Sequence, residues 1–217
     1  MKTLVKKLLR NLLPAKAWAY ISLIQSTDSY LYETGWMQSL QKKRPIDGSG
    51  NPIPWMNFSV VGFLAERLTN DLKVFEYGSG HSTYFFAKKV KQVTSVECDV
   101  KWFRTVKAQA PENVRQIFKE KDNDGDYCRV IGTMGDTFDV VVIDGLDRVN
   151  CVKQAIPALS SRGVVLLDDA QRDQYDEGIV FAKEKGFRVL VFEGLKANGS
   201  KINKTAVFYR DGNCLGI

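Results

Sequence analysis

The stretch VFEYGSGHSTYFFA, residues 74–87, decides the fold. Its first residues are typical of a buried strand, Gly78-Ser79-Gly80 of a tight turn, and the residues after them of a helix. Glycine lets the backbone turn sharply and approach a ligand closely, and the N–H groups at a helix start attract polar or anionic groups. Ligands of open parallel sheets bind at the carboxyl ends of the strands. The turn therefore lies where a cofactor would bind.

A Gly-x-Gly turn by itself is more typical of a plain structural turn than of a binding site. The dinucleotide fingerprint GxGxxG is not met, because Thr83 occupies the position of its third glycine. The interpretation of this turn as a cofactor site therefore needs support from other parts of the sequence.

Strand and helix patterns alternate on both sides of this turn. Continuous apolar strands such as VVVI and VVLL, separated by helices, predict a largely parallel sheet covered on both faces, that is, a doubly wound α/β fold. GLKANGSKIN joins the last two strands without a helix, so we expect the seventh strand to be antiparallel to the rest. A polar stretch from about 119 to 136 is predicted to be irregular. Strands are expected at 73–77, 92–97, 114–118, 138–143, 163–167, 187–192 and 205–209, and helices at 58–68, 83–90, 100–109 and in the two gaps after residues 143 and 167.

The length of 217 residues suits one α/β domain with an extension. We predict a basic helical extension and linker at 1–50 and the α/β domain at 51–217, joined through the Pro- and Gly-rich QKKRPIDGSGNPIPW. The extension has eight Lys and Arg against three acids, so +5 of the net charge of +6 lies there. Nucleic-acid binders carry a basic face on the folded domain, so no nucleic-acid partner is expected.

The first segment, MKTLVKKLLRNLLP, is predicted to form a short basic amphipathic helix that ends at Pro14. Its apolar run is too short to cross a bilayer or to act as a cleaved signal. Two roles remain open for this helix. It packs on its own domain or on a second subunit of a homodimer, or it attaches weakly to an anionic membrane surface.

The cysteines are scattered, with no pair at a metal-binding spacing, and are interpreted as free thiols in a reducing compartment. The chain has one histidine, His81, so a zinc site of the Cys and His type is not expected. A cytoplasmic location follows, peripheral at the inner membrane surface if the basic helix binds lipid.

Glu97 closes the second predicted strand, 21 residues after Glu76. An acid near this spacing hydrogen-bonds the ribose hydroxyls of an adenosine cofactor. For a single strand-end acid, a solvated side chain would be the favoured interpretation. The place of Glu97 after a glycine turn in the same strand-helix-strand unit favours the ribose role.

EYGSGHST, VTSVECD, FDVVVIDG and GVVLLDD together resemble the class I S-adenosylmethionine-dependent methyltransferase superfamily over about residues 58–210. An acid two residues before the first glycine is typical of that superfamily. More narrowly, PIPW followed by FL, then FEYGSGHST, and IDG followed by DR and C together look like a group of bacterial methyltransferase-like proteins of poorly defined substrate. The resemblance implies a seven-stranded Rossmann-like fold with S-adenosylmethionine as cofactor.

The resemblance also implies where the cofactor binds. Gly78 and Gly80 would line its methionine part, and Glu97 would hold the ribose. Asp122, or a neighbour in KEKDNDGDY, would lie near the adenine. The predicted cofactor-binding residues are Glu76, Gly78, Ser79, Gly80, His81, Ser82, Thr83, Glu97, Asp122 and Asp144.

Three carboxylates close the fourth and fifth strands: Asp144, Asp168 and Asp169. They resemble the metal-binding Asp and Asp-Asn of catechol-type O-methyltransferases, with Asp169 in place of the Asn. The resemblance implies a site for Mg²⁺ or another divalent cation, which would lower the pKa of an acceptor hydroxyl. Two alternatives stay open. Asp144 or Asp168 acts directly as a general base or binds the acceptor, or the acids only cap the loops that follow.

Four further residues have two interpretations each. His81 is a candidate base for a hydroxyl acceptor, or it contacts the cofactor or caps the helix. Arg148 binds an acidic acceptor or forms a surface ion pair. Tyr175 and Trp55 line the acceptor site or only pack.

The predicted function is S-adenosylmethionine-dependent methylation of a hydroxyl on a small molecule, sugar or glycan by in-line transfer. A nicotinamide-dependent oxidoreductase is a rival enzyme, although it needs a hydride-relay residue and usually a stricter glycine fingerprint. A non-catalytic methyltransferase-fold subunit that binds a partner through its first 50 residues is the rival from another class.

Overall fold

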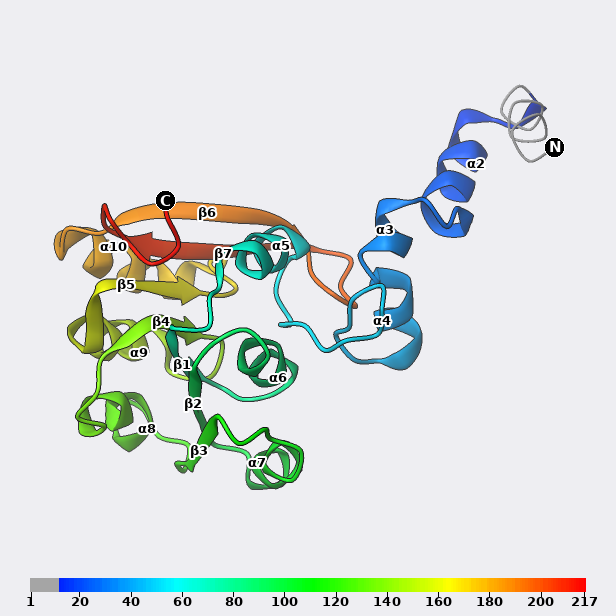
Figure 1. The fold of residues 1–217 in the computed structure, drawn as a ribbon. Coiled ribbons are helices and arrows are strands. Elements are labelled where there is room, and N and C mark those ends of the chain that lie inside the picture. Colours follow the sequence, from blue (N-terminus) through cyan, green and yellow to red (C-terminus); the bar gives the residue numbers. More distant parts are fainter. Residues whose placement is uncertain (1–11) are drawn as a thin grey trace. The chain divides into compact units, whose positions relative to one another are not determined.

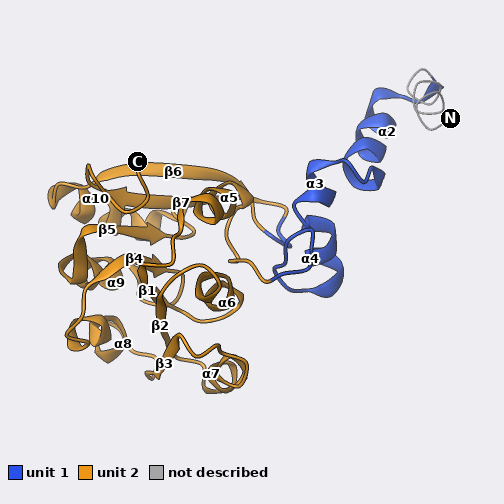
Figure 2. Ribbon diagram, in the orientation of Figure 1, with its two compact units in different colours: residues 1–51, 197–199 blue, residues 52–196, 200–217 orange. Residues whose placement is uncertain are grey.

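The computed structural model describes residues 12–217. The predicted basic helix that ends at Pro14 falls largely in residues 1–11, outside the described residues. The chain divides into two compact units, residues up to 51 with 197–199, and residues 52–196 with 200–217 (Figure 2). No helix of residues 12–217 has both the length and the apolar character needed to cross a bilayer.

The first unit is helical. It contains α2 (Ala15–Tyr20), a π-helical turn η1 (Ile21–Gln25), α3 (Tyr30–Glu33) and α4 (Trp36–Lys42). Gly35 joins α3 to α4 at a φ of +85°, and a Cβ there would overlap the carbonyl of Asp47. Trp36 donates its indole N–H to the carbonyl of Gly199 at 2.7 Å, which holds residues 197–199 in this unit.

The second unit is built on a seven-stranded sheet with the order β3-β2-β1-β4-β5-β7-β6 (Figure 1). β7 is antiparallel to both β5 and β6, and the pairs among β1 to β5 are parallel. The predicted seven-stranded doubly wound sheet with an antiparallel last strand is confirmed. The strands are β1 (Lys73–Tyr77), β2 (Gln92–Glu97), β3 (Val114–Phe118), β4 (Phe138–Ile143), β5 (Leu159–Leu167), β6 (Arg188–Leu195) and β7 (Ile202–Tyr209).

The register of the parallel strands sets the site. Tyr77 of β1 lies opposite Val96 of β2 and Ile143 of β4, and Ile143 lies opposite Leu167 of β5. The residues after these strand ends therefore share one edge of the sheet. This edge carries the glycine turn, Glu97 and the three aspartates, and is called the rim below.

Six α-helices of the second unit connect these strands or precede them. Near the end of β1, the Tyr77 hydroxyl donates to the Cys128 carbonyl of α8 at 2.6 Å. The helices are α5 (Phe58–Arg67), α6 (His81–Ala87), α7 (Val100–Lys107), α8 (Asp126–Arg129), α9 (Arg148–Ala155) and α10 (Asp176–Glu184).

The structure corrects several predicted boundaries, among them the start of β5, which lies at Leu159 instead of at 163. The stretch 119–136, expected to be irregular, contains α8 and a 3₁₀ turn at Val130–Thr133, because Tyr127, Cys128 and Ile131 are buried. α6 begins at His81 rather than at 83, since the Thr83 hydroxyl accepts from the N–H of Gly80 and caps the helix. The β6–β7 ladder extends to Leu195 and Ile202, beyond the apolar stretches, through exposed pairs that periodicity does not reveal.

Candidate functional site

The turn after β1 crosses the end of β2, where Gly78 N–H donates to the Val96 carbonyl at 2.8 Å. Gly78 has a φ of +90°, and a Cβ on it would lie 3.2 Å from the backbone of Gly145 in the turn after β4. A Cβ on Gly145 would in turn overlap the Tyr127 hydroxyl. The two turns therefore meet backbone to backbone, and a side chain at either position would separate them.

Glu76 lies beneath this turn and is fully buried. Its Oε2 accepts from the Thr83 hydroxyl at 2.6 Å, and that hydroxyl accepts from Gly80 N–H at 2.9 Å. Among the described residues, Oε1 of Glu76 has no hydrogen-bond partner. A buried acceptor left unpaired costs about 1–3 kcal/mol. The position therefore fits a ligand that brings a donor or a positive charge.

Burial raises the pKa of Glu76 to about 8. The hydroxyls of Ser82 and Thr83 oppose this shift of the pKa, and the charges of Asp144 and Glu97 add to it. The carboxyl is therefore largely protonated at neutral pH until a positive charge arrives beside it.

Glu97 closes β2 and is 7% exposed. Its Oε2 accepts from the Ser79 N–H at 3.0 Å and from the Ser79 hydroxyl at 3.2 Å. Its Oε1 accepts from the N–H groups of Cys98 and Asp99 at 2.8 and 2.9 Å. Four donors fill the usual capacity of a carboxylate. Glu97 thus orders the glycine turn, and the rotatable Ser79 hydroxyl is the donor that a ligand can most easily replace.

Trp102 is a residue of the site that the sequence interpretation missed. Its indole N–H donates to the Ser79 carbonyl at 2.7 Å, and its ring lies against Gly80. Asp99 caps α7 and places Trp102 in its first turn, so an aromatic residue shortly after the strand-end acid was the available signal.

His81 lies beside this indole, at the start of α6. The two rings are nearly parallel with centroids 6.5 Å apart, and His81 also meets the ring of Tyr84 edge to face at 6.3 Å. The structure therefore places His81 in an aromatic group next to the glycine turn.

The register brings Asp144, Asp168 and Asp169 together at the ends of β4 and β5. One carboxylate oxygen from each lies within 4.8 Å of the others. Asp168 is 0% and Asp169 5% exposed, and Asp169 has a φ of +55°, in the left-handed region. The Asp144 side chain is 28% exposed, so it is the member of the cluster that solvent or a ligand reaches most readily.

Two cations, one from the β6–β7 loop and one three residues after Asp169, neutralise the cluster on one side. Lys196, in the loop between β6 and β7, places Nζ 3.3 Å from Asp168 Oδ2 and 3.3 Å from Asp169 Oδ1. Arg172 lies 2.7 Å from Asp169 Oδ2. The second strand of the β6–β7 hairpin adds two neutral donors, the Asn203 amide to Asp169 at 3.0 Å and the Thr205 hydroxyl to Asp168 at 2.7 Å.

Arg148 is the third cation, and it is 8% exposed. Its guanidinium donates to the carbonyls of Gly145 at 3.0 Å, Asp168 at 2.6 Å and Asp144 at 3.0 Å, and to the Asp144 carboxylate at 3.0 Å. The ring of Tyr175 packs against it at 5.2 Å. Arg148 is therefore neither a surface ion pair nor available to an acidic acceptor. It ties the turn after β4 to the end of β5.

These charges shift the carboxyl pKa values in opposite directions. Burial and the charge of Asp168 raise the pKa of Asp144, against Arg148 and Lys196. Burial alone would also raise the pKa of Asp169, but Lys196, Arg148 and Arg172 outweigh it and lower that pKa. Asp144 is thus the rim acid with the stronger tendency to take up a proton.

The cluster does not fit a divalent cation as it stands. Three carboxylates face three cationic side chains, so their charges already balance. The Lys196 ammonium lies against two of the three acids, where an ion would have to bind. A divalent ion would need to displace it from buried partners.

Asp122 lies in the loop after β3 and serves the loop itself. Both of its carboxylate oxygens lie 3.3 Å from the N–H of Tyr127, at the start of α8. A Cβ on Gly125 would overlap this carboxylate. Of the two acceptor-wall candidates, Tyr175 packs on Arg148, and Trp55 is 49% exposed.

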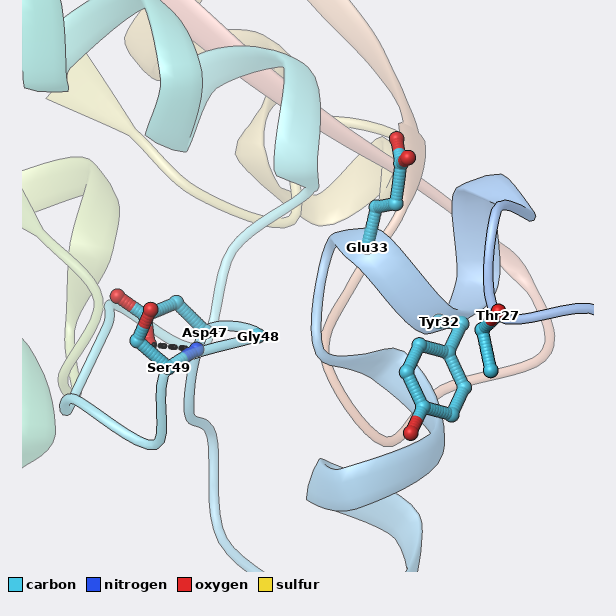
Figure 3. Close-up of a pocket in the computed structure, with 6 residues that line it drawn as sticks. All are labelled: Thr27, Tyr32, Glu33, Asp47, Gly48 and Ser49. Atoms are coloured by element: carbon cyan, nitrogen blue, oxygen red, sulfur yellow. Dashed lines mark hydrogen bonds between the residues drawn. The ribbon is translucent and has the colours of Figure 1, made fainter.

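Each unit has a hollow in its surface. One of about 410 Å³ lies outside the turn after β4 and shares Gly145, Arg148 and Tyr175 with the groups above. The other, of about 470 Å³, lies in the first unit, between Thr27 and Tyr32 and the turn at 47–49 (Figure 3). There Asp47 accepts from the N–H groups of Ser49 and Asn51, so its carboxylate closes its own turn.

No protein-family model matches the sequence, and no curated protein matches it. Solved structures match the fold. A precorrin 8W decarboxylase from Methanobacterium thermoautotrophicum has a TM-score of 0.53 at 15% identity, over 78% of this chain and 97% of that one. The chain has the class I methyltransferase fold.

Two further structures with this fold support the assignment. A precorrin-6y C5,15-methyltransferase from Geobacter metallireducens has a TM-score of 0.51 at 16% identity, over 70% of this chain and 87% of that one. A methyltransferase candidate from Streptococcus mutans, solved with S-adenosylhomocysteine, has 0.51 at 13% identity, over 69% and 94%. At these identities the likeness establishes the methyltransferase fold, and the chemistry has to be argued from the rim.

Proposed function

We propose that the chain is an S-adenosylmethionine-dependent methyltransferase that binds its cofactor at the glycine turn. One observation carries the proposal: a fully buried carboxyl, Glu76, has an unpartnered oxygen directly beneath a turn that only glycine permits. Such an oxygen needs a hydrogen-bond donor or a positive charge beside it, and the cofactor has both. Gly78, Ser79, Gly80 and Thr83 would surround its methionine part.

Glu97 would hold the ribose. Since its four acceptor positions are filled, a ribose hydroxyl would take the place of the Ser79 hydroxyl and leave the three backbone donors in position. Asp122 and the loop after β3 would lie near the adenine, and Ser82 would support Glu76.

When bound, S-adenosylmethionine supplies a methyl group activated by its sulfonium. The rim then has to orient an acceptor oxygen in line with that group and to accept its proton. Asp144 is our candidate for the proton acceptor, because its pKa is raised and its carboxylate is partly exposed. Asp168 is less suited, since both of its oxygens already have partners. His81 is the alternative base.

The distribution of charge in the chain is our basis for proposing the class of acceptor. The rim is acidic but internally neutralised, and the basic excess lies in residues 1–50. A hydroxyl of a small molecule, sugar or glycan fits such a rim better than a polyanion does. Oxygen is our choice of acceptor atom because a rim carboxylate suffices to take up a hydroxyl proton during transfer.

Calorimetric titration with S-adenosylmethionine and S-adenosylhomocysteine tests the cofactor. We expect micromolar binding, about −8 kcal/mol. Glu97→Ala leaves three backbone donors unpaired around the turn and is expected to weaken binding at least about 100-fold, the equivalent of roughly 3 kcal/mol. Ser79→Ala, which removes only the replaceable hydroxyl, is expected to bind within about threefold of the wild type.

The exposed Glu112→Ala serves as the matched control, and circular dichroism establishes that each variant is folded. Absence of binding of both ligands by folded wild-type protein would remove the methyltransferase proposal. Binding without turnover on any hydroxylated acceptor would favour the non-catalytic subunit instead.

One feature of the sequence favours the nicotinamide-dependent oxidoreductase, but the structure argues against it. Tyr84 and Lys88 of α6 have the Tyr-xxx-Lys spacing of short-chain dehydrogenases. The Tyr84 hydroxyl, however, donates to the Val106 carbonyl of α7 at 3.3 Å, so it packs against that helix instead of serving a hydride relay. Titration with NADH in the same calorimeter is expected to show no binding.

The first unit is our candidate for attachment to a membrane surface or to a second copy of the chain. Several large apolar side chains of its described part are more than 40% exposed, namely Leu12, Tyr20, Leu23, Tyr30, Tyr32 and Leu40. A cytoplasmic protein, peripheral at the inner membrane surface or dimeric, is the arrangement we propose.

A further inference from the structure

The three rim aspartates lie close enough together to hold an ion. Their oxygens converge within 4.8 Å, and two of the three side chains are buried. Buried carboxylates this close repel one another strongly unless a positive charge lies among them. The question is which group supplies that charge.

Arg148 and Arg172 are poor substitutes for such an ion. Arg148 donates to three backbone carbonyls and to the Asp144 carboxylate at 3.0 Å, and its guanidinium approaches Asp169 only to 3.6 Å. Arg172 is 51% exposed and reaches Asp169 from outside. Neither bridges two buried carboxylates at short range.

Lys196 does bridge them. Its ammonium is equidistant, at 3.3 Å, from Asp168 and Asp169, and only 21% of its side chain is exposed. Burial would lower its pKa, but Asp168, Asp169 and Asp144 outweigh burial and raise it, so the group stays protonated. A compact ammonium is the side-chain group that most resembles a small cation.

We propose that the Lys196 ammonium is the resident cation of this cluster and occupies the place of a divalent ion. The wild-type protein then binds no divalent cation at the rim. Removal of Lys196 leaves three convergent carboxylates with a deficit of one charge, which is a donor set suited to a hard cation. If the proposed methyltransferase function holds, its methyl transfer is independent of metal.

Titration with Mn²⁺, followed by calorimetry and by electron paramagnetic resonance, tests this directly. We expect no saturable binding by the wild type up to about millimolar Mn²⁺, and a new site of one Mn²⁺ per chain in Lys196→Met, at least about tenfold tighter. Lys196→Arg keeps the charge and is expected to bind no Mn²⁺. Lys204→Met removes a lysine of the same hairpin that pairs with the exposed Glu193, and it is the matched control.

Saturable Mn²⁺ binding by the wild type that is lost in Asp168→Asn would overturn the proposal. Failure of folded Lys196→Met to gain a site would overturn it as well. If Lys196→Met does not fold, Lys196→Gln replaces it. The titration of the wild type tests the proposal even if neither variant folds. The Mn²⁺ titrations contain no S-adenosylhomocysteine. Their outcome is therefore independent of the cofactor titration, which tests the methyltransferase proposal separately.

Discussion

The two halves of the rim carry similar acids in opposite states. At the ends of β1 and β2, Glu76 is buried with one oxygen unpartnered, and the turn above it has no side chain to fill the space. At the ends of β4 and β5, three acids are matched by Arg148, Arg172 and Lys196. In the first half one carboxyl oxygen, Glu76 Oε1, has no partner, whereas in the second half every acid is paired with a cation of the chain.

The difference indicates a division of labour. An unpaired buried acceptor is unfavourable in the empty protein, and a ligand that pairs it recovers that free energy on binding. A balanced cluster recovers little from a ligand, but it holds two strand ends in a fixed position. We infer that the β1–β2 half provides cofactor affinity and the β4–β5 half provides rigid positioning.

The largest effect is expected from a substitution in the β4–β5 half of the rim. Arg148→Met leaves buried carbonyls and Asp144 without their guanidinium, and we expect the free energy of unfolding to fall by about 3–5 kcal/mol. Urea denaturation measures it. Arg129→Met, which removes an exposed pair with Asp124, is the control, with an expected loss below about 1 kcal/mol. Equal losses in both variants would contradict the positioning role of Arg148.

An intermediate effect is expected from a substitution in the β1–β2 half of the rim. Gly78→Ala forces a side chain into a φ of +90° and to 3.2 Å from Gly145, and should cost about 1–3 kcal/mol and abolish S-adenosylhomocysteine binding. Gly186→Ala meets similar strain at a φ of +80° with no atom within 4 Å. It should lose stability yet bind normally in calorimetry. Normal binding by Gly78→Ala would show that the turn is not the cofactor site.

The pH dependence of stability sharpens the comparison further. The pKa of Glu76 is about 8 in the folded chain against an ordinary 4.5, so between these values the folded state holds a proton that the unfolded state has lost. This contribution to stability is complete below about pH 4.5 and falls by at most about 1.4 kcal/mol per pH unit up to about pH 8. Glu76→Gln cannot ionise and should remove that slope.

Urea denaturation of the wild type and of Glu76→Gln at pH 5, 6, 7 and 8 measures this slope, with the exposed Glu112→Gln as control. An identical pH dependence in wild type and Glu76→Gln would mean that Glu76 is not held in its protonated form. The proposed role of its unpartnered oxygen would then lose its electrostatic basis.

Local patterns in the sequence were sufficient for most of the fold. Strand-like stretches of five or six residues placed β1 to β4 correctly. β1, β2 and β4 are buried almost throughout, as strands covered on both faces are, whereas the edge strand β3 has no buried residue. The missing helix between the last two strands predicted the antiparallel β7. α8 escaped prediction because its four residues contain a single turn, too short for a periodicity, and only burial of Tyr127 and Cys128 stabilises it.

The sequence by itself also determined that Glu76, Glu97 and the three aspartates share one rim, since each closes or follows a parallel strand. Only the tertiary structure decided their states. Lys196, Asn203 and Thr205 reach Asp168 and Asp169 from 27 to 37 residues away along the chain. No local pattern encodes such pairs, because the folded hairpin alone brings these donors to the strand ends. Whether an acid awaits a ligand or is already neutralised is therefore a property of the fold.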